Sequence, residues 1–178
     1  MNNKMVFNGL IIAVLCGNTL SPLCAEEKAI GPEMREGIEW CAIRHMNANR
    51  VTLPRVLLVG DSIVNGYSYP VNERLKGIAD VSWYQTSRCM GDPVFDQELD
   101  MVLGLYDYAV IYFNNGLHGA SFSDEQYERA LARTFKKLAT QDSVIVWRDS
   151  TLINPDIEDD AGRARISRRN EIAHAYAE

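Results

Sequence analysis

The sequence predicts a single α/β domain with a mainly parallel sheet. Three observations lead to this fold class. Short apolar runs rich in branched residues are spaced along the chain, segments with apolar positions at three- and four-residue intervals lie between them, and glycine or asparagine follows several of the runs. Strands that alternate with helices in this way form layered α/β folds. The length of 178 residues is that of one such domain.

The predicted elements are justified in order along the chain. A helix is expected over residues 33–45, because Met34, Cys41 and His45 recur at helical spacing. The run 55–60 (RVLLVG) then predicts a buried strand that ends in glycine. The elements expected after it are a helix over 71–78, a strand over 81–85, a helix over 92–105, a strand over 108–113, a helix over 127–138 that follows the capping-box spacing of Ser123 and Gln126, a strand over 143–147, a polar loop over 154–162 and a helix over 164–177.

Residues 1–25 have the order of a secretory signal peptide. Lys4 is their only charged residue, the apolar run 10–16 follows it, and a polar end with Pro22 comes next. We expect cleavage after Ala25 and a secreted or periplasmic protein. A buried N-terminal helix is the alternative, although the apolar run is short for one.

The cysteines leave two questions open. Cys16 and Cys24 invite a lipoprotein interpretation, but a leucine precedes each where a small residue is needed, which argues against a lipid anchor. The mature domain 26–178 keeps only Cys41 and Cys89, which are either a disulfide pair or two ordinary buried thiols.

Composition excludes several classes of function. The chain has 18 Lys and Arg against 24 Asp and Glu, a net charge of -6, which disfavours nucleic-acid binding. No apolar run approaches the roughly 18 residues of a membrane-spanning helix. No CxxC pair supports a zinc or iron–sulfur site. No metal or organic cofactor is implied.

Three unusual turns follow predicted strands, and they carry the functional argument. They span residues 60–62, 87–92 and 114–119. In parallel sheets ligands bind at the carboxyl ends of the strands, so these turns are expected to converge there.

The first turn offers a serine at the start of a helix. Gly60 permits a tight turn, and Asp61 or Ser62 can cap the helix that follows. Capping alone explains an Asp-Ser pair. The functional interpretation places a nucleophilic Ser62 where backbone N–H groups favour a developing oxyanion.

The other two turns offer hydrogen-bond donors. The backbone N–H of Gly91 has no side chain to block it, although a loop glycine is the commoner explanation. Asn114 and Asn115 can donate to an oxyanion or form Asx turns. Arg88 is a candidate substrate contact or a solvated charge, and His118 lies on the same turn as the asparagines.

These residues resemble the motifs of the SGNH (GDSL-type) serine hydrolases. Residues 59–63 (VGDSI) with Gly66 resemble the block that carries the nucleophile. Residues 114–119 (NNGLHG) resemble the third block, usually Gly-x-Asn-Asp, with Asn114 as the preferred oxyanion donor and Asn115 as second choice. Gly91 is the best match to the second-block glycine.

The resemblance implies a flavodoxin-like three-layer α/β/α sandwich and hydrolysis of acyl esters through an acyl-serine. Ser62 attacks the carbonyl carbon, and the oxyanion is held by the backbone N–H groups of Ser62 and Gly91 with the Asn114 amide. Asp61, Asn115, His118 and Arg88 are then candidate substrate contacts. The expected substrate is a small-molecule or carbohydrate ester, with acetylated carbohydrate as one case.

The family's Asp-x-x-His block, which supplies the acid and the base, is absent from this sequence. The helix expected over 164–177 resembles the one that precedes that block, so we expect the C-terminal part of the domain to be missing. Of the three histidines, we expect His45 to be structural and His174 to lie at the surface. His118 is a substrate contact or a substitute base.

Two other functions remain open at this stage. One is a non-catalytic ligand-binding remnant of the same fold, without the acid–base block. The other is a flavodoxin-like protein that binds a phosphate or a flavin at the helix that starts near Ser62. A glycine-rich phosphate loop is absent, which makes this last hypothesis the weakest.

Overall fold

The computed structural model describes residues 31, 34–151, 154–156 and 159–177. The predicted signal peptide over residues 1–25 lies outside the described residues.

The described chain forms one sheet of five strands and four helices. The strand order is β1-β3-β2-β4-β5, in which β1 runs antiparallel to β3 and all other pairs are parallel. The elements are β1 (Cys41–His45), β2 (Arg55–Gly60), α1 (Ser62–Arg74), β3 (Asp80–Thr86), α2 (Pro93–Leu103), β4 (Val110–Phe113), α3 (Asp124–Leu138), β5 (Val144–Trp147) and α4 (Asp160–Ala177).

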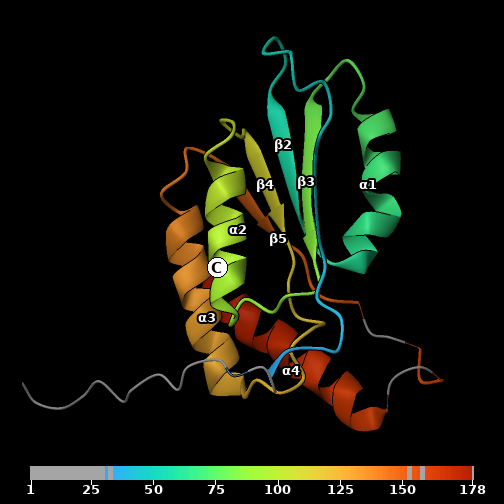
Figure 1. Cartoon of the computed structure of the whole chain (residues 1–178), viewed down its shortest axis with the longest axis vertical. Coiled ribbons are helices and arrows are strands. Elements are labelled where there is room, and N and C mark those ends of the chain that lie inside the picture. Colours follow the sequence, from blue (N-terminus) through green and yellow to red (C-terminus); the bar gives the residue numbers. More distant parts are fainter. Residues whose placement is uncertain (1–30, 32–33, 152–153, 157–158, 178) are drawn as a thin grey trace, which may run out of the picture.

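Helices lie on both sides of this sheet (Figure 1). Helix α1 covers one face, α2 and α3 cover the other, and α4 crosses the end of the sheet at the bottom of the view. The larger apolar core joins the sheet to α2, α3 and α4, and a smaller one joins it to α1. The protein is therefore an α/β protein with a mostly parallel five-stranded sheet, compatible with a flavodoxin-like fold.

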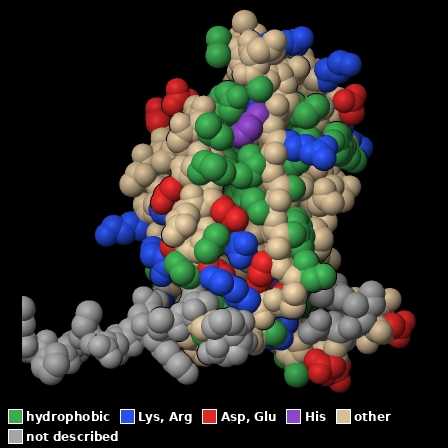
Figure 2. Space-filling model, viewed as in Figure 1, with side chains coloured by type: hydrophobic (Ala, Val, Ile, Leu, Met, Phe, Trp, Pro, Cys, Tyr) green, Lys and Arg blue, Asp and Glu red, His purple; other side chains and the backbone are tan. Residues whose placement is uncertain are grey.

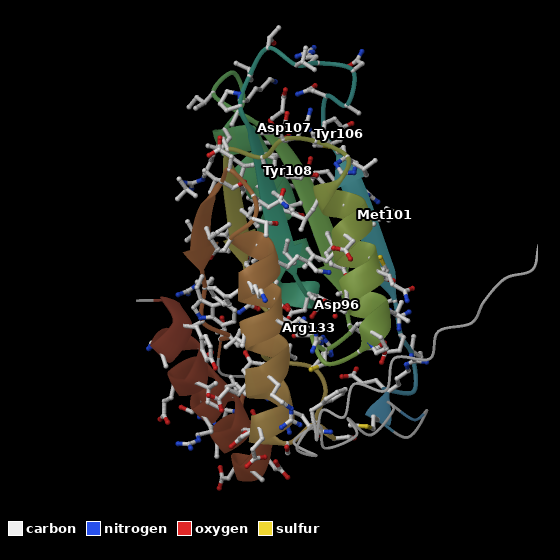
Figure 3. The ribbon with its side chains drawn as sticks, turned by 90° about the vertical axis from the view of Figure 1, so that its left-hand side faces the viewer. Asp96, Met101, Tyr106, Asp107, Tyr108 and Arg133 are labelled. Atoms are coloured by element: carbon white, nitrogen blue, oxygen red, sulfur yellow. The ribbon has the colours of Figure 1, made fainter. Side chains whose placement is uncertain are left out.

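Salt bridges and aromatic contacts hold the α2–α3 layer together. Figure 3 shows Asp96 of α2 and Arg133 of α3 side by side, and Arg133 Nε donates to Asp96 Oδ2 at 2.9 Å. Tyr106 and Tyr108 follow α2, and their ring centroids lie 6.3 Å apart. The Asp96–Arg133 pair joins the two helices over one face of the sheet, and the tyrosine pair packs the chain that follows α2.

Charge and apolar surface are unevenly placed on the molecule. Figure 2 shows apolar side chains in the middle of one face, over the sheet between α1 and α2, and most charged side chains toward its margins.

Among the described helices, none combines the length and the apolar character that crossing a bilayer requires.

Most of the predicted elements are confirmed, including the capping box of Ser123 and Gln126 at the start of α3. The helix predicted over 33–45 is wrong, because residues 41–45 form the edge strand β1 and residues 39–40 are irregular. The helical spacing of its apolar residues is coincidental. The free edge of β3 pairs with all five residues of β1 and thereby overrides the local pattern.

Two boundaries also differ from the predictions. Helix α1 begins at Ser62, well before the predicted 71–78, because the Asp61 side chain caps it there. Helix α4 begins at Asp160, inside the predicted polar loop.

Cys41 is exposed and Cys89 is buried, and both are free thiols.

Candidate functional site

The nucleophile turn joins β2 to α1. Asp61 is the N-cap of α1, and its Oδ1 accepts the Ile63 N–H at 2.8 Å. Ser62 is the first residue of the helix and is exposed. A Cβ on Gly60 would lie 2.1 Å from Val64 Cγ2, so only glycine lets the helix turn back so closely on the strand. This local sequence places a serine hydroxyl in solvent at a helix N-terminus.

Asp61 is an uncommon cap, since it is 1% exposed and its Oδ2 has no hydrogen-bond partner among the described residues. Burial raises the pKa of its carboxyl above the ordinary value. The hydrogen bond from Ile63 and the charge of His118 act in the opposite direction without reversing the shift.

The second turn is tied into the protein. The Arg88 guanidinium lies 3.2 Å from Glu98 Oε1 and 3.8 Å from Asp92 Oδ2. A Cβ on Gly91 would lie 2.2 Å from the Phe122 ring, so glycine is needed here for packing. Burial raises the pKa of the neighbouring Cys89 thiol. Arg88 therefore has ion-pair partners inside the chain, and Gly91 is constrained by packing.

Both asparagines of the third turn are hydrogen-bonded. Asn114 Nδ2 donates to the carbonyl of Arg148 at 2.6 Å and to Ser150 Oγ at 3.1 Å. Asn115 accepts the Met90 N–H at 3.2 Å and donates to the carbonyl of Arg88 at 2.9 Å. Asn115 thus joins the third turn to the second, whereas Asn114 joins it to the segment after β5.

His118 is held by a carboxylate from the segment before β1. Its Nδ1 lies 2.7 Å from Glu36 Oε1, and its Nε2 is buried without a hydrogen-bond partner in the described chain. Arg35 of the same segment binds Asp92 through two bonds, of 2.7 and 3.2 Å. The segment before β1 therefore contacts both the second and the third turn.

Sequence analysis missed the residue that fixes the third turn. Arg169 of α4 is fully buried and donates to four backbone carbonyls, those of Gly116, His118, Gly119 and Phe122. Its guanidinium also lies 4.8 Å from the ring centroid of Tyr127. Burial lowers its pKa. No motif in the sequence marks it, because its partners are backbone groups about fifty residues away.

A pocket of about 170 Å³ opens beside the nucleophile turn. It adjoins Ser62 through the next two residues of α1 and reaches the chain after β5. Burial raises the pKa of Tyr67 in this pocket. The lining residues are Ile63, Val64, Tyr67, Asn114, Arg148, Asp149 and Thr151. Of these, sequence analysis singled out only Asn114.

The other two histidines have partners outside the nucleophile turn, although the partner of His174, Asp149, lines the pocket beside that turn. His45 Nδ1 lies 2.9 Å from Ser82 Oγ, within the sheet. His174 is an exposed residue of α4, and its Nε2 lies 2.9 Å from Asp149 Oδ1. In the part of the chain that the structure describes, no hydrogen bond joins any imidazole to Ser62. The same residues include no cluster of three or more metal-binding side chains.

Comparison with models of protein families and with curated proteins finds no match to this chain. The fold and the site thus define an α/β protein with an exposed serine at a helix N-terminus, beside a small pocket at the carboxyl ends of parallel strands.

Proposed function

We propose that the protein is an exported serine esterase that hydrolyses small acyl esters through an acyl-serine at Ser62. One observation carries the proposal: Ser62 is exposed as the first residue of α1, and the pocket begins at the two residues that follow it. A helix N-terminus favours the negative charge that develops on the carbonyl oxygen during acyl transfer. The resemblance to the SGNH hydrolases and the predicted signal peptide agree with this role.

The size of the pocket favours a short acyl group. Ligand pockets for drug-sized molecules are typically about 300 to 1,000 Å³, and this pocket is about 170 Å³. Ile63 and Val64 supply apolar lining, and Arg148 and Asp149 supply charged lining. An acetyl ester of a polar alcohol, such as a carbohydrate, fits these dimensions and this chemistry.

Asn114 is the proposed oxyanion donor, and it lines the pocket. Its amide hydrogens already bind Arg148 and Ser150, so substrate must displace one of these bonds to use the amide. The same observation favours a second candidate function, a ligand-binding protein of this fold without catalysis.

Hydrolysis of 4-nitrophenyl acetate by the full chain tests the proposal. We expect release of nitrophenolate above the blank, loss of this release in Ser62→Ala, and no change in Ser167→Ala, which removes an exposed serine from α4. Equal rates in the wild type and Ser62→Ala would rule out a serine esterase. Binding of an acetylated sugar to both proteins without turnover would then favour the ligand-binding function.

A further inference from the structure

Strand β5 leaves one edge of the sheet open. It is the last strand in the sheet order, and among the described residues only β4 pairs with it. Figure 3 shows β5 at the border of the sheet. An open edge presents N–H and C=O groups that another strand can bind. The strand Val144–Trp147 has no charged residue and no proline to discourage such pairing, whereas β1 at the opposite edge carries the exposed Arg44.

The backbone groups at this open edge belong to the odd-numbered residues of β5. The N–H of Val144 donates to the carbonyl of Ala109 at 3.0 Å, and the N–H of Arg148 donates to that of Phe113 at 2.9 Å. These even-numbered residues therefore face β4. Successive residues of a strand turn their backbone groups to opposite sides, so those of Ile145 point to the open edge. An added antiparallel strand would exchange two hydrogen bonds with Ile145.

The exposed side chains of this segment form a pattern that is complementary to its own reverse. Exposure alternates from residue to residue over 141–149, and the exposed residues are Asp142, Val144, Val146 and Arg148. Val144 is 64% exposed and Val146 is 37% exposed. The pattern thus has an acid at one end, a base at the other and two valines between them. A second copy that runs antiparallel places unlike charges opposite each other and valine opposite valine.

A two-fold axis at Ile145 satisfies the backbone and the side chains in one register. Ile145 then lies opposite Ile145 of the second copy, and Val144 lies opposite Val146. Asp142 lies opposite Arg148. The valine and charge pairs occupy the positions without mutual backbone bonds, where side chains of antiparallel strands approach most closely. Neither Asp142 nor Arg148 has an ion-pair partner among the described residues, so this pairing breaks no existing ion pair. The interface closes after two copies and covers both open edges.

We propose that two copies of this chain pair antiparallel through β5 and join their sheets into one continuous sheet. The pairing covers the exposed valines and places Asp142 of the second copy beside Arg148, which lines the pocket. Each pocket is then bordered by a charge of the other copy. A parallel strand from another polypeptide is the competing occupant of this edge, but it gains nothing from the self-complementary pattern. Only the consequence for the pocket bears on the proposed function.

Analytical ultracentrifugation of the full chain over a range of concentrations tests the pairing. We expect a species with twice the mass of one chain. Asp142→Arg sets two arginines opposite each other at both ends of the interface, and Arg148→Asp sets two aspartates there. Each change is expected to raise the dissociation constant about tenfold. The double variant restores unlike pairs and is expected to restore the dimer, which a folding defect would not do. A wild type that stays monomeric at about 0.1 mM would overturn the proposal.

Glu73→Arg is the matched control for the change of charge. Glu73 is an exposed acid of α1, a helix that packs on β2 and β3. This variant changes the net charge as much as Asp142→Arg does and is expected to keep the dissociation constant of the wild type. Equal weakening of the dimer by Glu73→Arg and Asp142→Arg would show an effect of net charge alone and would overturn the proposed register.

Amide hydrogen exchange locates the interface on the chain. We expect the Ile145 N–H to become protected as the protein concentration rises, because the second copy then accepts it. The Val144 N–H is bonded within one copy and is expected to be protected throughout. A dimer in which Ile145 stays unprotected would have its interface elsewhere and would overturn the proposal. Both measurements are made without substrate, so a dimer without esterase activity supports this inference and overturns the esterase, and a monomeric esterase does the reverse.

Discussion

Two buried aspartates cap two helices of this protein in opposite electrostatic settings. Asp61 caps α1 and Asp92 caps α2, and each accepts a backbone N–H two residues further on. Burial alone would raise both pKa values. Arg35, together with the Val94 N–H and Arg88, reverses the effect at Asp92, whose pKa is lowered, whereas Asp61 has no arginine partner among the described residues and its pKa is raised.

The different settings of the two aspartates distinguish the nucleophile turn from the other two turns. The second and third turns, around Asp92 and Asn115, are tied together by ion pairs and amide bonds. The nucleophile turn keeps a poorly satisfied carboxyl and an exposed Ser62. Strongly perturbed pKa values, such as the raised pKa of Asp61, are more frequent at functional sites than elsewhere. The comparison therefore supports Ser62 as the reactive group and the other two turns as its scaffold.

The largest effect is expected where the scaffold is tied to α4. Arg169→Leu leaves four buried carbonyls without their donor and is expected to lower the free energy of unfolding by about 3 to 5 kcal/mol. Urea denaturation measures the loss. The adjacent Arg168→Leu is the control, because that side chain is 62% exposed and is expected to matter little. Equal midpoints for the two variants would contradict the scaffold.

A glycine pair tests the packing of the second turn. The new Cβ of Gly91→Ala meets the Phe122 ring, and we expect a loss of about 1 to 3 kcal/mol. Gly66 lies inside α1 with nothing within 4 Å of an added Cβ. Gly66→Ala is expected to gain about 0.5 to 1 kcal/mol. Thermal unfolding checks both signs, and destabilisation by both changes would refute the packing argument.

The two caps themselves form the next test. Asp92→Asn removes the ion pair with Arg35 and is expected to cost about 1 to 2 kcal/mol near neutral pH. Asp61→Asn keeps its cap and no longer buries a charge, so we expect it to be neutral or stabilising. Denaturant unfolding of both variants at one pH decides the matter. Similar losses at both sites would remove the contrast on which the comparison rests.

The smallest expected effect is the loss, in acid, of the stabilisation that the ion pair between Asp92 and Arg35 provides. Because the pKa of Asp92 is lowered in the folded state, its ion pair stabilises the protein above the ordinary carboxyl range, and this stability is lost as the pH falls through the lowered value. We expect Arg35→Gln to be less stable than the wild type near neutral pH, and the difference to shrink in acid. Unfolding midpoints of both proteins, measured from neutral to acidic pH, give this difference in stability. A difference that is constant with pH would exclude the ion pair as its source.

The convergence of the three candidate turns was predictable from the sequence, because parallel strands bring the turns that follow them to one end of a sheet. The turns at Ser62, Gly91 and Asn114 occupy that end. The alternation of strands and helices likewise predicted the α/β class and its mostly parallel sheet.

The partners of these turns were not predictable, because they depend on tertiary contacts. Strand β1 forms only because β3 has a free edge, and its five residues carry a helical pattern by coincidence. Glu36 and Arg169 reach the third turn from opposite ends of the chain. Neither residue belongs to a motif, since one binds an imidazole and the other binds backbone carbonyls.

The most direct test of the central claim is covalent labelling of Ser62. The full chain is treated with a fluorophosphonate, digested and mapped by mass spectrometry, with Ser62→Ala treated in parallel. We expect an adduct on the peptide that contains Ser62 and no adduct on that peptide in the variant. An unlabelled wild-type protein, or labelling that survives in Ser62→Ala, would contradict it.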